Sequence, residues 1–352
     1  MLDDPNRIRE QVRDYYGSVL TGSADLKTDA CCTSGPPPAR IAAALANVHP
    51  DVTARFYGCG FPIPEALDGR TVVDLGCGTG RDVFVLAQLV GPSGRVIGVD
   101  MTAAQLAVAE RTRDWHAARF GHPRSNVTLH HGLIEDLGFL ADGSVDVVVS
   151  NCVVNLAADK EVVLREVRRV LAPGGEFYLS DVFCDRRLPP DVARDPLLHA
   201  ECLGGALYDF DFDQLAKRVG FGDPRTLASS PIAVRSPAIA ERVGAARFRS
   251  ITQRLFALDG LEPRCEDYGQ LATYRRPIPG VGAAFQLDDH HLFELGRPER
   301  VCGNTAAMLR DTRFGPYVDV VGDTSVHFGV FDCGPTIAAR GRPTDGSSSS
   351  CC

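Results

Sequence analysis

The sequence lacks several features that would assign it to a large class of protein. It contains no uninterrupted run of about 18 apolar residues, the length that a membrane-spanning helix requires, so we predict no membrane span. Residues 1–5 do not begin the basic and then apolar pattern of a secretory signal peptide. We therefore expect a protein of the cytoplasm.

The chain also lacks a net positive charge and the paired cysteine spacing of metal sites. The formal net charge is −8 and the isoelectric point is about 5.6, which argues against nucleic-acid binding. No C-x-x-C pair occurs, so the spacing does not indicate a tetrahedral zinc site, and we expect no metal cofactor. We see no internal repeat.

Cysteine is abundant instead, with 12 residues in the 352-residue chain. A secreted disulfide scaffold of this size without a signal peptide is not expected. In a reducing compartment, many cysteines more often indicate metal binding or thiol chemistry. Most of the 12 could still be small buried hydrophobic residues. The neighbouring residues in the sequence therefore have to indicate which cysteines are functional.

A glycine-rich turn organises the middle of the chain. The apolar stretch 71–75 reads as a strand, and residues 83–90 read as a helix. Between them lie Gly76, Gly78 and Gly80, which let the backbone turn tightly and approach a ligand. The following helix N-terminus offers unpaired N–H groups. Taken alone, this pattern is equally consistent with a tight turn that needs glycine but binds no ligand.

A second strand, residues 95–100, favours the cofactor interpretation. It ends at Asp100, where a carboxylate suits ribose hydroxyls in dinucleotide-binding folds. The pattern that binds a pyrophosphate would require glycine at position 81, which is Arg81. We therefore predict a cofactor with adenosine and ribose but no pyrophosphate, and S-adenosylmethionine fits that description.

Strands that alternate with helices predict an α/β fold with a doubly wound, mostly parallel sheet and an appended smaller α+β region. The stretch 145–150 is apolar throughout, as in a strand buried on both faces. Ligands bind beyond the carboxyl ends of such strands, which puts Cys152 where a substrate should lie. The expected division is an N-terminal cover, a cofactor domain, a segment that completes the core, a C-terminal domain and a disordered tail (residues 1–65, 66–185, 186–245, 246–338 and 339–352).

Other cysteines lie in settings that favour function over packing. Glycines on both sides of Cys59 should uncover its sulfur, and Cys202 precedes two glycines that permit close approach. Cys31 lies in a polar, proline-bounded loop that we expect to be exposed. The helix predicted over residues 5–20 is more simply a packing helix. The tail ends in two further cysteines, for which binding or exchange is the expected use.

At this point the chain resembles the arsenite S-adenosylmethionine methyltransferases, which are Rossmann-like class I enzymes. The stretches at 150–156 and 201–207 carry the resemblance most specifically, because general methyltransferases of this fold do not have both. Further matches are residues 15–17, residues 25–28 before Cys31, and residues 57–60, 74–82 and 98–102. Cys77 departs from the family, where serine is common, and we interpret it as a packing substitution.

The resemblance implies a role for four cysteines. Cys59, Cys152 and Cys202 would bind trivalent arsenic, and Cys31 falls at the family's fourth cysteine position. Thiolates are soft ligands that suit such a centre. Arsenic held by three sulfurs keeps a lone pair, which can attack the methyl group of S-adenosylmethionine without a general base. The cofactor contacts are expected from Asp74, Gly76, Gly78, Gly80, Asp100, Met101, Ile134, Glu135 and Asn151.

Methylation formally oxidises arsenic, so a two-electron reductant is required. We expect Cys31 and Cys59 to supply the electrons by forming a disulfide, which thioredoxin or glutathione would then reduce. Arsenite and methylarsenite are the expected substrates, and a monomer is the default assembly.

Two other interpretations stay open from the sequence. An ordinary O-, N- or C-methyltransferase of small molecules explains the glycine loop, with His130, His131 or Glu135 available as a base, but it leaves the four cysteines as coincidence. A non-enzymatic thiol protein that sequesters arsenic or soft metals explains the cysteines but not the cofactor loop. A zinc enzyme fits less well, since the spacing matches no known ligand pattern.

Overall fold

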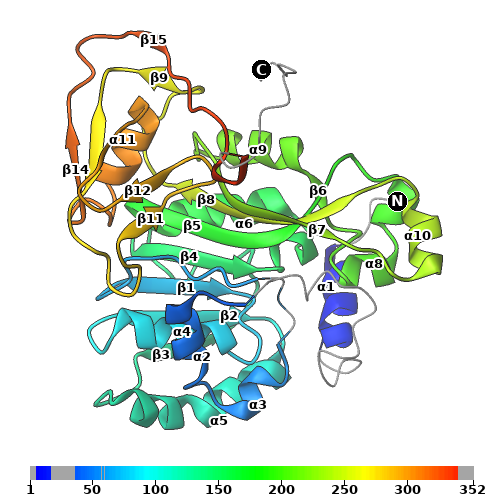
Figure 1. The fold of residues 1–352 in the computed structure, drawn as a ribbon. Helices are drawn as coiled ribbons and strands as arrows, with labels where there is room; N and C mark the ends of the chain where they lie inside the picture. The colour runs from blue at the N-terminus through cyan, green and yellow to red at the C-terminus, as the bar shows by residue number, and fades with distance from the viewer. Residues whose placement is uncertain (1–4, 17–35, 57, 59, 340–352) are drawn as a thin grey trace.

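A central sheet dominates the computed structural model, which describes residues 5–16, 36–56, 58 and 60–339 (Figure 1). The sheet has eight strands in the order β3-β2-β1-β4-β5-β8-β7, and β6 pairs with β5. Strands β3 to β5 are parallel, whereas β8 is antiparallel to both β5 and β7. The predicted doubly wound, mostly parallel sheet is confirmed.

The strands of this sheet are mostly short and apolar. Their bounds are β1 Thr71–Leu75, β2 Arg95–Asp100, β3 Val127–His131, β4 Val145–Asn151, β5 Leu171–Cys184, β6 Leu207–Tyr208, β7 Arg225–Ile232 and β8 Phe248–Phe256. The helices are α1 Pro5–Asp14, α2 Ala39–Leu45, α3 Pro50–Thr53, α4 Arg81–Val90, α5 Ala103–Phe120, α6 Lys160–Val170, α7 Pro190–Ala193, α8 Pro196–Ala200, α9 Asp209–Arg218, α10 Pro237–Val243 and α11 Gly303–Arg310.

Helices cover both faces of the sheet, as Figure 1 shows. Side chains alternate between the two faces along each strand. On β1, Val72 packs with helices α2 to α5, whereas Val73 packs with α6 and α9. This burial of both faces explains why β1 and β4 are apolar throughout.

Strand β5 contains a Pro-Gly-Gly stretch near its start. It runs from Leu171 and includes residues 173–175. Gly174 donates its N–H to the carbonyl of Ala257, 2.8 Å away, and has a φ of 75°. A Cβ on Gly174 would lie 2.3 Å from the carbonyl oxygen of Asp311, so glycine here permits close approach of the C-terminal region.

The C-terminal region begins later than the expected boundary at 246, because β8 belongs to the central sheet. Beyond it lie small antiparallel sheets around α11, formed by β9 Glu266–Asp267, β10 Leu271–Tyr274, β11 Ala284–Gln286, β12 Leu292–Glu294, β13 Pro298–Arg300, β14 Val318–Val321 and β15 Gly329–Val330. A buried ion pair ties this region to the core, since Arg313 contacts Glu176 on β5, which is also paired with Arg254 of β8.

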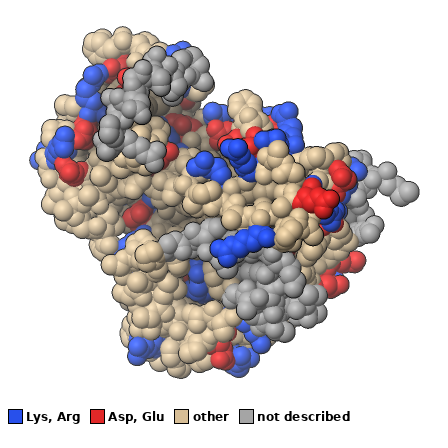
Figure 2. All heavy atoms as spheres, turned by 45° about the vertical axis from the view of Figure 1, so that its right-hand side comes forward, with Lys and Arg blue, Asp and Glu red and all other residues tan. Residues whose placement is uncertain are grey.

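Helix α1 covers Pro5–Asp14, and residues 17–20 of the predicted helix lie outside the described residues. Residues 190–200 form the two short helices α7 and α8. The predicted disordered tail lies almost wholly outside the described residues. Within the described parts of the chain, no helix has the length and apolar character needed to cross a bilayer. On the face drawn in Figure 2, acidic and basic side chains are interspersed.

Candidate active site

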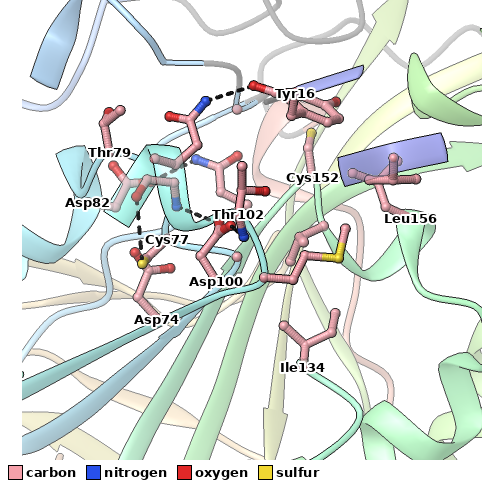
Figure 3. A pocket seen from close by; sticks show the side chains of 18 of the residues that line it. Tyr16, Asp74, Cys77, Thr79, Asp82, Asp100, Thr102, Ile134, Cys152 and Leu156 are labelled. Atoms are coloured by element: carbon pink, nitrogen blue, oxygen red, sulfur yellow. Dashed lines mark hydrogen bonds between the residues drawn. The ribbon is translucent and has the colours of Figure 1, made fainter. Parts of the chain in front are cut away.

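A cavity opens at the carboxyl ends of β1, β2 and β4 (Figure 3). All predicted cofactor residues except Gly80 line it, namely Asp74, Gly76, Gly78, Asp100, Met101, Ile134, Glu135 and Asn151. Cys152 also lines this cavity. In Figure 3 its sulfur points toward Tyr16, while Asp74 and Asp100 lie on the other side. The structure therefore brings the predicted cofactor residues and one predicted arsenic ligand to one cavity.

The three glycines of the loop have different reasons to be glycine. Gly76 has a φ of 66°, and a Cβ there would lie 2.3 Å from a methyl carbon of Val153. Gly78 has a φ of 54°, but a Cβ there would meet no atom within 4 Å among the described residues. Gly80 precedes α4, and its added Cβ would face Phe84 at 3.0 Å. Gly78 thus leaves open space for a ligand, whereas Gly80 serves packing.

Asp100 is held at the end of β2 by backbone donors. Its carboxylate accepts hydrogen bonds from the N–H groups of Gly78 and Thr102, each at 2.8 Å. Burial raises the pKa of Asp100, and those two hydrogen bonds oppose the shift. The backbone of the glycine loop is therefore hydrogen-bonded to Asp100, the carboxylate that we predicted to bind the cofactor.

Asp74 is a buried carboxyl group that faces the cavity. Burial raises its pKa well above the usual range, and the neighbouring charge of Asp82 acts in the same direction. None of the described residues donates a hydrogen bond to its side chain. A buried acid without a donor suits a cationic or hydroxyl-bearing ligand.

These features fit S-adenosylmethionine. Asp74, Asp100 and Glu135 offer acceptors to a molecule that carries an amino group, a sulfonium and ribose hydroxyls, while Met101 and Ile134 offer apolar contact to an aromatic ring. Open space at Gly78 permits close approach of a ligand to the backbone.

Asn151 and Arg81 fix the segment that contains residue 59. The amide of Asn151 donates to Asp82 at 2.9 Å and to the carbonyl of Gly60 at 3.1 Å, and Arg81 donates to the same carbonyl at 3.0 Å. A Cβ on Gly58 would lie 2.5 Å from the Asn151 side chain. Gly58 and Gly60 are both buried, so they allow close packing at the site. The predicted exposure of the Cys59 sulfur concerns a residue outside the described part of the chain.

Cys152 and Cys202 come together although 50 positions separate them in the chain. The Cys202 thiol donates to the carbonyl oxygen of Cys152, with 3.4 Å between sulfur and oxygen. Cys152 is 4% exposed and Cys202 is fully buried, and both belong to one apolar cluster with Val12 of α1. Two of the three predicted arsenic ligands therefore share a site that excludes water.

Both cysteines have left-handed backbone conformations, with φ of 56° at Cys152 and 62° at Cys202. Such values are strained for a residue with a side chain, and strain of this kind is typical of functional sites. The loop after Cys202 is pressed against the chain after β4. A Cβ on Gly205 would lie 2.0 Å from the carbonyl oxygen of Asn155, so the Gly-Gly pair permits the approach that the sequence suggested.

A polar group beside these cysteines was missed from the sequence. Asp181 on β5 accepts from the Asn155 side chain at 2.7 Å and from the N–H of Val182 at 2.8 Å. Burial raises the pKa of Asp181 to about 6. Burial lowers the pKa of Lys160, whose charge interacts with Asp181 and Cys202. Lys160 is the first residue of α6.

Helix α1 was expected to be a packing helix, but it covers the cavity. Arg9 forms an ion pair with Glu135 at 3.2 Å, and the Tyr16 hydroxyl donates to the carbonyl of Ala200 at 2.9 Å. Gln105 donates to the carbonyl of Tyr16 at 3.0 Å. The helix thus connects the cofactor side of the cavity to the cysteine side, which helical periodicity alone could not indicate.

The remaining predicted site residues are placed as follows. Cys31 and Cys59 lie outside the described residues. Cys77 is buried, its sulfur lies against Gly98, and burial raises its pKa well above the usual range. These surroundings agree with the packing role that we assigned to Cys77.

Comparison with known proteins gives the family. A model described as a methyltransferase domain matches residues 67–220. The chain is 56% identical to an arsenite methyltransferase of Aquipseudomonas alcaligenes over 98% of this chain and 100% of that protein. It is 43% identical to the human arsenite methyltransferase over 87% of this chain and 82% of that protein.

A solved structure agrees with these relatives. The crystal structure of an arsenic(III) S-adenosylmethionine methyltransferase from Chlamydomonas reinhardtii superposes with a TM-score of 0.82 at 50% identity, covering 84% of this chain and 100% of that chain. Together with the cavity and the paired cysteines, these similarities show that the chain belongs to the arsenite methyltransferase family.

Proposed function

We propose that this protein transfers the methyl group of S-adenosylmethionine to trivalent arsenic bound by Cys59, Cys152 and Cys202. The observation that carries the proposal is the contact between Cys202 and the backbone of Cys152, at the edge of the cofactor cavity. Neither an ordinary small-molecule methyltransferase nor a protein that only sequesters metals requires two strained, buried cysteines beside that cavity.

The chain's own contribution is mainly position and exclusion of water. When bound, S-adenosylmethionine supplies an electrophilic methyl group. Sulfur-bound arsenic has no proton to lose, so the side chains need not act as a base. The apolar cluster around Cys152 and Cys202 keeps water from the site, and proximity lowers the barrier to in-line transfer.

Charge around the thiols supports the loading of arsenic. Thiolates, rather than thiols, are the ligands of soft centres. The cationic side chain of Lys160 lies within electrostatic reach of Cys202 and favours its thiolate form. The charge of Lys160 also acts on the buried Asp181, whose pKa burial raises to about 6.

The reductive step belongs to Cys31 and Cys59 in this proposal. Two thiols lose two electrons and two protons as they form a disulfide, and trivalent arsenic is restored. Thioredoxin or glutathione then reduces the disulfide. We further propose that a monomer acts in the cytoplasm and accepts arsenite and methylarsenite.

An arsenite turnover assay tests the proposed ligands. Wild type, Cys152→Ser and Cys202→Ser are incubated with S-adenosylmethionine, a thiol reductant and arsenite, and the arsenic species are separated and quantified. Cys184→Ser is the matched control, since Cys184 is a buried free cysteine of the same apolar cluster. We expect methylated arsenic from wild type and the control only. Full activity in either ligand variant would contradict the assignment.

A further inference from the structure

Ala66 has an unfavourable backbone conformation that the transfer site does not explain. Among the described non-glycine residues, only Ala66, Cys152 and Cys202 have positive φ, and the value at Ala66 is 55°. A conformation of this kind is kept only when neighbouring contacts hold it. The two cysteines belong to the proposed arsenic site, whereas Ala66 follows Cys59 by a short segment. The contacts around Ala66 therefore bear on the third predicted ligand.

The C-terminal region supplies the contacts at this point. Ala66 packs against the apolar cluster of that region. The guanidinium of Arg313, which follows α11, donates from Nε to the carbonyl oxygen of Glu65 at 2.8 Å. The same guanidinium pairs with Glu176 on β5. Arg313 therefore connects the chain just before Ala66 to the central sheet.

Further cations hold the side chain of Glu65. Arg254 of β8 pairs with its Oε2 atom, and Arg40 of α2 lies 3.7 Å from its Oε1 atom. Burial would raise the pKa of Glu65, but the charges of its arginine neighbours outweigh that effect and lower the pKa. Arg40 also donates to the carbonyl of Ile63. Glu65 is thus an ionised carboxylate held by the sheet and by α2.

The segment between Gly60 and Glu65 is stiff. Pro62 and Pro64 fix φ at two of its positions, and each also restricts the residue before it. Both prolines are buried, as is Ile63, whose N–H donates to a carbonyl within the segment at 2.7 Å. A shift at Glu65 is therefore transmitted along the segment to Gly60 rather than absorbed within it.

The other end of this segment adjoins the arsenic site. The carbonyl of Gly60 accepts from Asn151 at 3.1 Å and from Arg81 at 3.0 Å. Asn151 immediately precedes Cys152. Gly60 immediately follows Cys59, the third predicted ligand. The position of that ligand relative to Cys152 therefore depends on how the segment is held.

We propose that Arg313 is a positioning residue of the arsenic site: through Glu65, it lets the C-terminal region hold the segment that places Cys59 beside the other two ligands. The inference rests on the proposed function, because it needs Cys59 as an arsenic ligand. It gives the C-terminal region a part in the reaction although none of its described residues lines the methyl-transfer cavity.

Valence makes this role selective between the two substrates. Arsenite offers three positions that thiols can replace, whereas methylarsenite offers two, because carbon occupies the third. Methylarsenite can therefore be held by Cys152 and Cys202 alone. A looser segment around Cys59 should slow methylation of arsenite and spare methylarsenite, which a general loss of stability would not do.

First-turnover rates measure this selectivity, because the first transfer precedes any reductive step. Reduced protein in excess over arsenite or methylarsenite is mixed with S-adenosylmethionine, and the methylated product is quantified over time. Arg313→Lys keeps a charge beside Glu176 but lacks the planar fork with which arginine bonds two partners at once. We expect the arsenite rate to fall by about tenfold or more and the methylarsenite rate to stay within about twofold.

Hydrogen exchange shows whether the variant acts through the segment. Amide exchange in peptides that span residues 60–66 should be faster in Arg313→Lys than in wild type. Arg310→Ala is the matched control, because it breaks an exposed ion pair with Asp311 in the same part of the chain. It should change neither the exchange nor either rate. Arg40→Lys, which loosens the segment from α2, should show the same selectivity and keeps the test decisive should Arg313→Lys not fold.

The inference and the proposed function can be told apart when they fail. Equal slowing of both substrates by Arg313→Lys, unchanged rates, or unchanged exchange over residues 60–66 would overturn the inference and leave the proposed function standing. Wild type that methylates neither arsenical would overturn the proposed function, and the inference with it.

Discussion

The thiol of Cys202 donates a hydrogen bond to the backbone carbonyl of Cys152, across 3.4 Å. Both residues have positive φ, so the chain bends unfavourably at each cysteine in order to bring the two together. Such strain persists only where the surrounding structure enforces it. Here, β4 and the short helix α8 fix the two bends from either side.

Backbone strain at Cys202 should make a glycine substitution less destabilising there than it usually is. In ordinary backbone conformations a glycine variant unfolds more easily than an alanine variant, but a left-handed conformation costs alanine roughly 1–2 kcal/mol. We compare Cys202→Gly with Cys202→Ala by denaturant unfolding, and Cys184→Gly with Cys184→Ala as the control within β5. The difference in unfolding free energy between the alanine and glycine variants should be smaller at Cys202 than at Cys184 by roughly 1–2 kcal/mol. Equal penalties at the two positions would show that Cys202 is not strained.

Gly78→Ala should weaken cofactor binding without preventing folding. Its methyl group would meet no described atom within 4 Å, so it would enter the space left for the ligand. Affinity for S-adenosylmethionine, measured by calorimetry, should fall by about tenfold or more. Gly121→Ala is a matched control, since Gly121 also has positive φ and open surroundings but lies at the end of α5, away from the cavity. Equal affinity in both variants would contradict the predicted cofactor position.

His116 should make stability depend on pH. Its ring stacks on Phe84 and is bonded to the N–H of His49 and the carbonyl of Thr112, and burial lowers its pKa to about 4. The unfolded chain therefore binds more protons below about pH 6.5, and stability is lost as pH falls from there toward 4. Between pH 7 and 5, His116→Gln should lose about 2 kcal/mol less free energy of unfolding than wild type. Identical losses in denaturant titrations would refute this.

The buried ion pairs should fasten the C-terminal region to the sheet. Arg313 contacts Glu176 of β5 and donates to the carbonyl of Glu65 at 2.8 Å. Arg313→Ala removes one of the two cations that contact the buried Glu176 and leaves Arg254 as its partner, so it should cost about 1–3 kcal/mol of unfolding free energy. Arg310→Ala breaks an exposed ion pair with Asp311 and should cost less than about 1 kcal/mol. Similar losses in the two variants would show that the Glu176 pair contributes little.

The sequence predicted those parts of the fold that depend on local pattern. The apolar strands β1 and β4, the glycine loop and Asp100 were all evident, because burial on both faces and a tight turn leave a direct mark on residue type. The predicted fold and family are confirmed. The roles predicted for individual cysteines stay predictions.

The parts that were missed depend on tertiary pairing. Strand β8 lies beside β5 although about 70 residues separate them, and nothing in its sequence states which strand it joins. The same holds for α1, whose periodicity shows an apolar side but not that the cofactor cavity lies beneath it.

The most direct test of the account is a single-turnover measurement on the wild-type enzyme. Protein in excess over arsenite is mixed with S-adenosylmethionine and reductant, and S-adenosylhomocysteine and methylated arsenic are quantified over time. We predict one S-adenosylhomocysteine for each methyl group found on arsenic, and neither product without arsenite. S-adenosylmethionine that binds but gives no methylated arsenic would contradict arsenic as the methyl acceptor.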